Sequence, residues 1–352
     1  TAIAAGERSF SVAECNYVYH MQYISLMNTY GDYASTLFKL DTSKPLDEQE
    51  CPSFMNTEGK ENYTWDRYFR DATRSQLKQL AAYEAYAGQH DIKLDDDDLK
   101  EIDDTIASIA ETAKKNNYGS VSKFLAANYG RGCNESVARD IMKLQALAAK
   151  VQTSITDAET YTAEELAAKY DSVKDSYDKF TYSYYLVAAE VPEHVHSEDE
   201  SEDEHNHASE PTDEAKAAAH TTAEDILKKL SDGSSLADAA KAAVEGAEIK
   251  EQTDLVGSSV ESDISEWLKS ADRKAGDTTV IDGSTGSYVV VFTKRDNNQA
   301  PTEESGDQKY CDYVAENLLK QDVLSEWNEH VFSGIVEVYK GSFTGASRYV
   351  GI

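Results

Sequence analysis

The sequence predicts an α+β fold that is mainly helical, with a small α+β unit inserted between two helical parts. Amphipathic segments with capping signals fill most of residues 11–170, and β-type segments first occur from residue 180 onward. One more amphipathic segment follows the β-type segments, over residues 310–331. Proline, which breaks helix interiors, is scarce at 5 of 352 residues.

The N-terminal part, residues 1–176, is predicted to be an all-α unit. Its first helix opens on Ser11-Val-Ala-Glu14, in which the serine caps a backbone NH and the glutamate reaches back. Thr162-Ala-Glu-Glu165 repeats this capping pattern. We expect helices over 11–29, 64–88, 95–113, 120–128, 134–153 and 162–170, with a long irregular connection over 31–62.

Four consecutive aspartates, 95–98, open one of these helices. Carboxylates in a first turn suit the positive end of the helix dipole. A calcium loop is the alternative, but it needs a central glycine and a distal glutamate at fixed spacing, which this segment does not have. The run therefore indicates a helix start.

Residues 177–297 are predicted to form the inserted α+β domain, interrupted by a hydrophilic insertion over 190–215. Residues 180–189 are aromatic and β-branched, which is typical of a strand. Asp282-Gly-Ser-Thr-Gly286 is a hairpin signal between two further strands. The expected order is strand 180–189, helices 216–230, 236–244 and 265–271, and strands 278–281 and 287–293.

The C-terminal part, residues 298–352, is predicted to be a linker followed by the helix at 310–331 and a strand at 335–339. This helix has Leu318, Val323 and Trp327 on its apolar side and no sheet of its own nearby. We therefore expect it to pack on the N-terminal helices, which makes the helical unit discontinuous in sequence.

The formal net charge of −31 argues against nucleic acids and anionic membrane surfaces as partners. Nucleic-acid binding needs clustered Lys and Arg, and adhesion to an anionic membrane needs the same. The charge serves either solubility or the capture of basic partners. No run of 18 apolar residues occurs. The chain opens on Thr1 without a signal peptide, so we expect a processed N-terminus and membrane association only through an anchor that this chain lacks.

The four cysteines, Cys15, Cys51, Cys133 and Cys311, form no CxxC pair. This spacing excludes a zinc knuckle and a thioredoxin motif. Two interpretations stay open: isolated small apolar side chains, or one disulfide in an oxidising compartment.

A His-rich acidic stretch lies in the hydrophilic insertion. Residues 193–214 hold ten acidic residues, four histidines and no Lys or Arg. One interpretation is a solvated loop, since this composition cannot bury a core. The other is weak capture of zinc, nickel or copper by imidazoles, without a catalytic role, and no other cofactor is expected. The candidate ligands are His194, His196, His205 and His207.

Five short motifs in residues 180–295 resemble, in order, those of a parvulin, the small peptidyl-prolyl isomerase domain. Segments 6–14 and 129–135 are similar to the flanking helical chaperone module of the SurA/PrsA group. The resemblance implies an extracytoplasmic chaperone or foldase whose partners are unfolded or nascent exported polypeptides. The five motifs are Ser183-Tyr-Tyr-Leu-Val187, Leu230-Ser-Asp-Gly233-Ser-Ser-Leu-Ala-Asp-Ala-Ala240, Asp254-Leu-Val-Gly257, Ala275-Gly-Asp277 and Gly286-Ser-Tyr-Val-Val-Val291.

The resemblance places the candidate catalytic positions at Tyr184 and Tyr288, where active parvulins carry histidines. The family's acidic or cysteine position has no clear counterpart near residues 244–246. A tyrosine hydroxyl both donates and accepts hydrogen bonds but cannot act as an imidazole. We therefore expect a chaperone or foldase whose isomerase activity is weak or absent. The alternatives are an active peptidyl-prolyl isomerase and a metal-binding protein that uses the His-rich loop.

Overall fold

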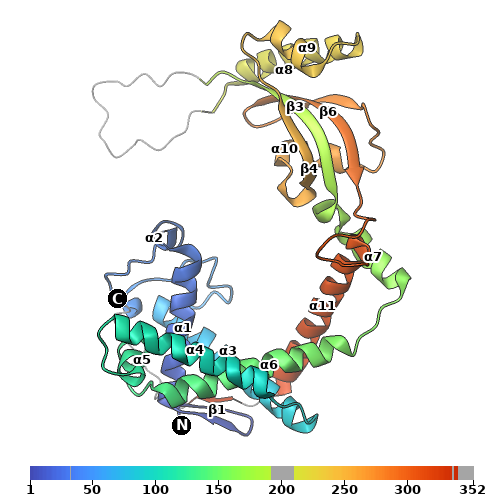
Figure 1. Cartoon of the computed structure of the whole chain (residues 1–352). Helices are drawn as coiled ribbons and strands as arrows, with labels where there is room; N and C mark the ends of the chain where they lie inside the picture. Colours follow the sequence, from blue (N-terminus) through green and yellow to red (C-terminus); the bar gives the residue numbers. More distant parts are fainter. Residues whose placement is uncertain (32, 192–209, 335–336, 340–352) are drawn as a thin grey trace, which may run out of the picture. The chain divides into compact units, whose positions relative to one another are not determined.

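The computed structural model divides into two compact units. The first consists of Thr1–Thr160 together with Lys320–Ile352, and the second of Tyr161–Leu319. The second is thus inserted into the first, and the predicted fold class, a helical unit built from both ends of the chain around a small α+β unit, is confirmed (Figure 1). The structure describes every residue except 32, 192–209, 335–336 and 340–352.

The first unit is helical and its core lies between α1, α3 and α6. Ser11 Oγ accepts from the Glu14 NH at 3.2 Å, and Glu14 Oε2 accepts from the Ser11 NH at 2.7 Å, so the predicted capping box is present. The predicted caps at Thr162 and Asn134 are also present. The helices are α1 (Val12–Tyr30), α2 (Tyr33–Phe38), the 3₁₀ turn η1 (Leu46–Glu48), α3 (Trp65–Gln89), α4 (Asp96–Lys115), α5 (Val121–Tyr129) and α6 (Glu135–Asp157).

A small antiparallel sheet joins the two ends of the chain in this unit. The strands β1 (Ile3–Ala5), β2 (Arg8–Phe10) and β7 (Glu337–Tyr339) are arranged in the order β2-β1-β7. β7 is the described part of the strand expected at 335–339. β1 and β2 were not predicted, because strands of three residues are too short to display an alternating pattern.

Helix α11 (Tyr310–Gly334) contributes its second half to the first unit. Trp327 stacks on Tyr83 with ring centroids 4.9 Å apart, and the Tyr83 hydroxyl donates to Asn328 Oδ1 at 2.9 Å. Val323 and Leu324 pack on the same core. The C-terminal helix therefore completes the helical core, as the fold class required.

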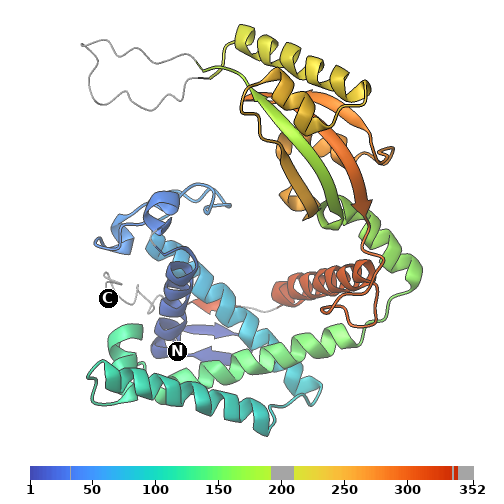
Figure 2. The same ribbon diagram turned by 45° about the horizontal axis from the view of Figure 1, so that its top comes forward.

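The second unit has a four-stranded antiparallel sheet in the order β4-β3-β6-β5. α8 and α9 cover one face and α10 covers the other (Figure 2). Its elements are α7 (Ala163–Tyr177), β3 (Lys179–Ala188), α8 (Asp213–Ser231), α9 (Leu236–Ala243), β4 (Lys250–Val256), the 3₁₀ turn η2 (Gly257–Ser259), α10 (Ser262–Lys269), β5 (Thr278–Asp282) and β6 (Gly286–Asp296).

Strand β4 corrects the expected order, which had no strand between the second and third helices of this unit. Most of its residues are exposed, because β4 is an edge strand. Its sequence, Lys-Glu-Gln-Thr-Asp-Leu-Val, therefore lacks an alternating apolar pattern. A register shift and a left-handed φ of 49° at Asp254 interrupt its pairing with β3.

The unit boundaries also differ from the expected 1–176, 177–297 and 298–352. α7 extends to Tyr177 rather than ending near residue 170, and it belongs to the second unit. Tyr170 and Tyr177 pack against Cys311 and Val314 at the start of α11. Contacts between segments distant in sequence set these boundaries, and local patterns do not reveal them.

Two further expectations concern membranes and disulfides. Across the described parts of the chain, no helix combines the length and apolar character that spanning a bilayer requires. All four cysteines are described, and each is free and buried. Burial raises the pKa of the Cys51 thiol to about 11, so it stays protonated at neutral pH.

Candidate functional site

Tyr184 and Tyr288 lie side by side on one face of the sheet in the second unit. Tyr184 on β3 pairs with Val290 of β6, and Tyr288 pairs with Leu186 of β3. The two tyrosines are thus diagonal neighbours, which places their side chains on the same face. Their ring centroids are 5.8 Å apart with an interplanar angle of 49°. The structure therefore brings together the two residues that the sequence singled out.

A third tyrosine extends this pair. Tyr182 precedes Tyr184 by two residues on β3 and so faces the same side. Its ring stacks on Tyr184 with centroids 6.0 Å apart. Its hydroxyl is buried and makes no well-formed hydrogen bond within the described residues. Burial raises the pKa of Tyr182, and the nearby Glu261 backbone offsets only a small part of this effect. The sequence motif did not point to Tyr182, but its place in the alternating strand pattern could have done so.

Two carboxylates approach the tyrosines from the start of α10. The Tyr184 hydroxyl donates a long hydrogen bond of 3.4 Å to Glu261 Oε1. Asp263 lies beside Tyr288 and accepts from the Ser284 NH at 3.3 Å. A Cβ at Gly283 would lie 2.3 Å from Asp263 Oδ2 and 2.7 Å from Tyr288 Cε2, so a glycine is needed there.

The electrostatics keep the tyrosine hydroxyls neutral. Burial, followed by the charge of Glu261, raises the pKa of Tyr184. Burial, followed by Asp263 and Glu261, raises the pKa of Tyr288. Burial raises the pKa of Tyr182 to about 12. At neutral pH these groups can donate or accept hydrogen bonds, but they cannot serve as bases.

The tyrosine pair is closed to solvent. Tyr184 is 3% exposed and Tyr288 is 7% exposed, because Ile264 and Leu268 of α10 pack in the same apolar cluster. Little of either tyrosine is therefore open to a polypeptide. The arrangement therefore resembles a packed core more than an open catalytic cleft.

A hollow beside α10 shares Asp263 with the surroundings of Tyr288. Its lining includes Asp263, Trp267 and Arg273. The Arg273 guanidinium lies over the Trp267 ring, 4.5 Å from the centroid, and Nη1 is 3.5 Å from Asp277 Oδ2. This surface can contact a side chain through apolar, cationic and anionic groups.

The acidic group near the tyrosines comes from a different segment than the resemblance suggested. Val244 caps α9 and packs with the cluster on the opposite face of the sheet, and Glu245 is exposed. Glu261 and Asp263 supply the carboxylates instead. Their only sequence signal is two acidic residues at the start of a short helix, Glu261 at the N-cap and Asp263 in the first turn, which is also what the helix dipole favours.

The proposed metal ligands His194, His196, His205 and His207 lie outside the described residues, so metal binding there stays a prediction. Within the described ranges, no group of three or more His, Cys, Asp or Glu side chains is arranged to hold a metal ion. His220 Nδ1 lies 2.8 Å from Asp282 Oδ1, which also accepts from Ser287 Oγ at 2.7 Å. Because the carboxylate lies between serine and histidine, this is not a nucleophilic triad.

Comparisons with known proteins found no matching family model and no matching curated protein. The chain is similar to solved structures of SurA-like chaperones and of PrsA. PrsA of Bacillus cereus is 13% identical, with 83% of this chain and 97% of that chain covered and a TM-score of 0.35. A SurA-like chaperone of Campylobacter jejuni is 13% identical, with 78% and 89% covered and a TM-score of 0.29. The foldase PrsA of Lactococcus lactis is 18% identical, with 79% and 87% covered and a TM-score of 0.28.

Proposed function

We propose that this protein is an extracytoplasmic chaperone that binds unfolded or nascent exported polypeptides, and that its inserted unit has lost isomerase activity. The proposal rests on the organisation of the chain into two units and on the position of the motifs in the second unit. The helical unit is made from both ends of the chain, and the α+β unit is inserted between these ends in sequence. The motifs at 183–187 and 286–291 lie on the adjacent strands β3 and β6. Two of the motifs that resemble those of a parvulin thus lie next to each other in one sheet.

The same site argues against isomerase chemistry. Lowering the barrier of an X–Pro bond, about 18–20 kcal/mol, requires a polar network that a substrate can reach. The hydroxyls of Tyr184 and Tyr288 are neutral and buried beneath α10. The inserted unit therefore supplies a scaffold and a binding surface rather than catalysis.

Suppression of aggregation tests the chaperone role. We expect the full chain, in several-fold excess, to keep a chemically unfolded client protein from aggregating on dilution, as followed by light scattering. An inert acidic protein of similar size and charge is the control for charge effects. Equal scattering with the chain and with this control would contradict the proposal.

A proline-limited refolding assay tests the loss of catalysis. We expect substoichiometric amounts of the chain to leave the slow refolding phase unchanged, because buried tyrosines, Tyr184 and Tyr288, stand at the positions where active parvulins carry histidines. An active parvulin in the same assay shows that the phase is sensitive to catalysis. An acceleration that Tyr184→Phe abolishes would restore the isomerase alternative.

A further inference from the structure

An exposed aromatic patch lies where α1, α2 and the following connection meet in the first unit. The three most exposed large apolar side chains of the described residues are Tyr33 at 70%, Phe54 at 63% and Leu37 at 53%. Tyr30, at 40%, is the fourth member. Contiguous exposed apolar groups of this kind mark binding surfaces, whereas scattered single ones do not.

Two of the four side chains, Tyr30 and Phe54, pack against one buried ring, Phe38, and the other two lie on α2, the helix that carries Phe38. Tyr30 packs edge-on against Phe38 with centroids 4.6 Å apart, and Phe54 lies 6.0 Å from it. Tyr33 and Leu37 are four residues apart on α2, so they share one helix face. Phe38 in turn contacts the fully buried Trp65 of α3. The patch therefore rests on the core of the unit.

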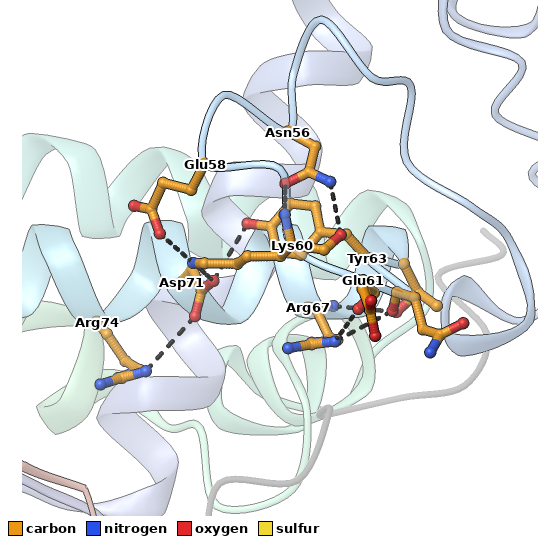
Figure 3. A network of polar contacts seen from close by, with 10 residues as sticks. Asn56, Glu58, Lys60, Glu61, Tyr63, Arg67, Asp71 and Arg74 are labelled. Carbon is orange, nitrogen blue, oxygen red and sulfur yellow. Dashed lines mark hydrogen bonds and ion pairs between the residues drawn. The ribbon is translucent and has the colours of Figure 1, made fainter.

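A polar network holds the connection beside this patch in a fixed path (Figure 3). Lys60 Nζ pairs with Glu58 at 3.0 Å and with Asp71 of α3 at 2.7 Å. Asn56 brackets the Lys60 backbone, accepting from its NH at 2.9 Å and donating to its carbonyl at 2.8 Å. Phe54 lies two residues before Asn56, so its exposure is imposed by an anchored loop.

The charge around the patch indicates which kind of ligand it favours. The connection over 39–62 holds six acidic residues and three lysines, so acidic residues exceed basic ones by three even though Lys44 and Lys60 pair with Asp41 and Glu58 of the same connection. Beside α2 lies a hollow whose lining includes the apolar Leu40 and the oppositely charged Lys39 and Asp41. Apolar groups with an acidic rim complement a ligand that combines apolar and basic side chains. A second copy of a chain with a net charge of −31, or an anionic membrane, would be repelled instead.

We propose that the aromatic patch of Tyr30, Tyr33, Leu37 and Phe54 binds extended polypeptide segments in which aromatic or aliphatic residues stand next to Lys or Arg. This inference rests on the proposed chaperone function and names the surface that contacts the client. The apolar side chains of the segment cover the patch, and its basic side chains face the acidic connection. Binding is therefore expected to weaken as salt concentration rises.

The test compares Tyr33→Ser/Leu37→Ser with the matched control Leu99→Ser, which changes an exposed apolar residue on α4 of the same unit. The probe is a short fluorescent peptide that alternates Phe or Leu with Lys, and binding to the full chain is followed by anisotropy. We expect the double variant to bind roughly tenfold more weakly, because a few exposed apolar anchors dominate such contacts. Leu99→Ser should bind like the unmodified chain, and circular dichroism confirms that both variants fold.

Two further peptides separate the contributions of charge and apolar contact. Replacing Lys by Glu, or Phe and Leu by Ser, should each abolish binding. If the unmodified chain binds the peptide and suppresses aggregation, but the double variant does both equally well, the patch is not the client surface and the chaperone proposal stands. If the unmodified chain does not suppress aggregation at all, the proposed function itself fails. Self-association, or flotation with anionic vesicles, that is lost in the double variant would show a different occupant and overturn the inference.

Discussion

Replacing Asp178 by alanine is expected to destabilise the second unit by about 3 kcal/mol, because it leaves the Arg295 guanidinium without its buried carboxylate partner in a low-dielectric site. Asp178 is 1% exposed. Its Oδ2 accepts from Arg295 Nε at 2.6 Å, and its Oδ1 accepts from the Tyr170 hydroxyl at 2.7 Å. Loss of the carboxylate therefore leaves both a guanidinium and a hydroxyl without their main partner.

The position of Asp178 explains why the effect should spread through the unit. It joins the end of α7 to the start of β3, while Arg295 lies near the end of β6. Asn298, just beyond β6, donates to the Tyr170 hydroxyl and to the Tyr177 carbonyl, each at 2.8 Å. The network thus links the junction of α7 and β3 to the end of β6.

Asp175→Ala is the matched control, because Asp175 pairs with the same guanidinium at 2.7 Å but is 57% exposed. An exposed ion pair contributes about 0–1 kcal/mol, so this variant should lose little stability. The measurement is native-state hydrogen exchange of the β3 and β6 amides, which reports the opening free energy of this unit alone. Equal losses in both variants would show that burial of Asp178 is not what matters.

A double variant separates the lost hydrogen bonds from the stranded charge. In Asp178→Ala/Arg295→Met the guanidinium is also removed, so stability should recover part of the way towards that of the unmodified chain. A double variant that is less stable than Asp178→Ala would show that the packing of Arg295 on Phe180, 5.1 Å from its ring centroid, outweighs the charge.

Local sequence patterns predicted the elements whose stability is local. The capping box at Ser11 and the apolar spacing of α3, α4 and α6 gave these helices to within a few residues, because caps and helix faces are set by neighbours in sequence. The capping box at Thr162 gave the start of α7 but not its end. Strand β4 was missed because most of its side chains, on both faces of the sheet, are exposed, so its sequence does not alternate between apolar and polar residues. Helix α2 was missed because its six residues bury only Ala34 and Phe38, which is too little for a periodic signal.

The candidate site was predictable only where a motif covered it. Tyr184 and Tyr288 were found because they replace residues of a recognisable pattern on β3 and β6. Glu261 and Asp263 meet them through tertiary packing of α10, and no spacing in the sequence reveals that contact. Closure of the site likewise depends on Ile264 and Leu268 packing over the sheet. Burial of the tyrosines is therefore a result of the fold and not of the motif.

His20 should make the first unit sensitive to acid. Its side chain is 3% exposed, and neither ring nitrogen has a hydrogen-bond partner among the residues that the structure describes. Burial lowers the pKa of His20 from 6.5 to about 4, so the folded unit holds the imidazole neutral. Between these two values the unfolded chain binds more protons than the folded one, so acidification favours unfolding.

The free energy of unfolding of the first unit is therefore not reduced by His20 above pH 6.5. It decreases as the pH falls from 6.5, and the full loss is reached below the folded-state pKa of about 4. One pKa unit corresponds to about 1.4 kcal/mol, so the full loss from this single group is about 3 kcal/mol. The check is the free energy of urea unfolding of the first unit, measured at a series of pH values in this range through amide exchange of α1 and α3.

His20→Leu is the matched variant, because leucine is close in volume and cannot take up a proton. Carboxylates elsewhere titrate equally in both proteins, so the difference between the two curves isolates His20. At neutral pH we expect the variant to be at least as stable as the unmodified chain, since it no longer buries two unpartnered ring nitrogens beside Asn16 and Gly130. The curves should diverge below pH 6.5. Parallel curves would mean that His20 finds a proton-accepting partner or leaves the core on acidification, and the acid sensitivity would then have to come from the carboxylates.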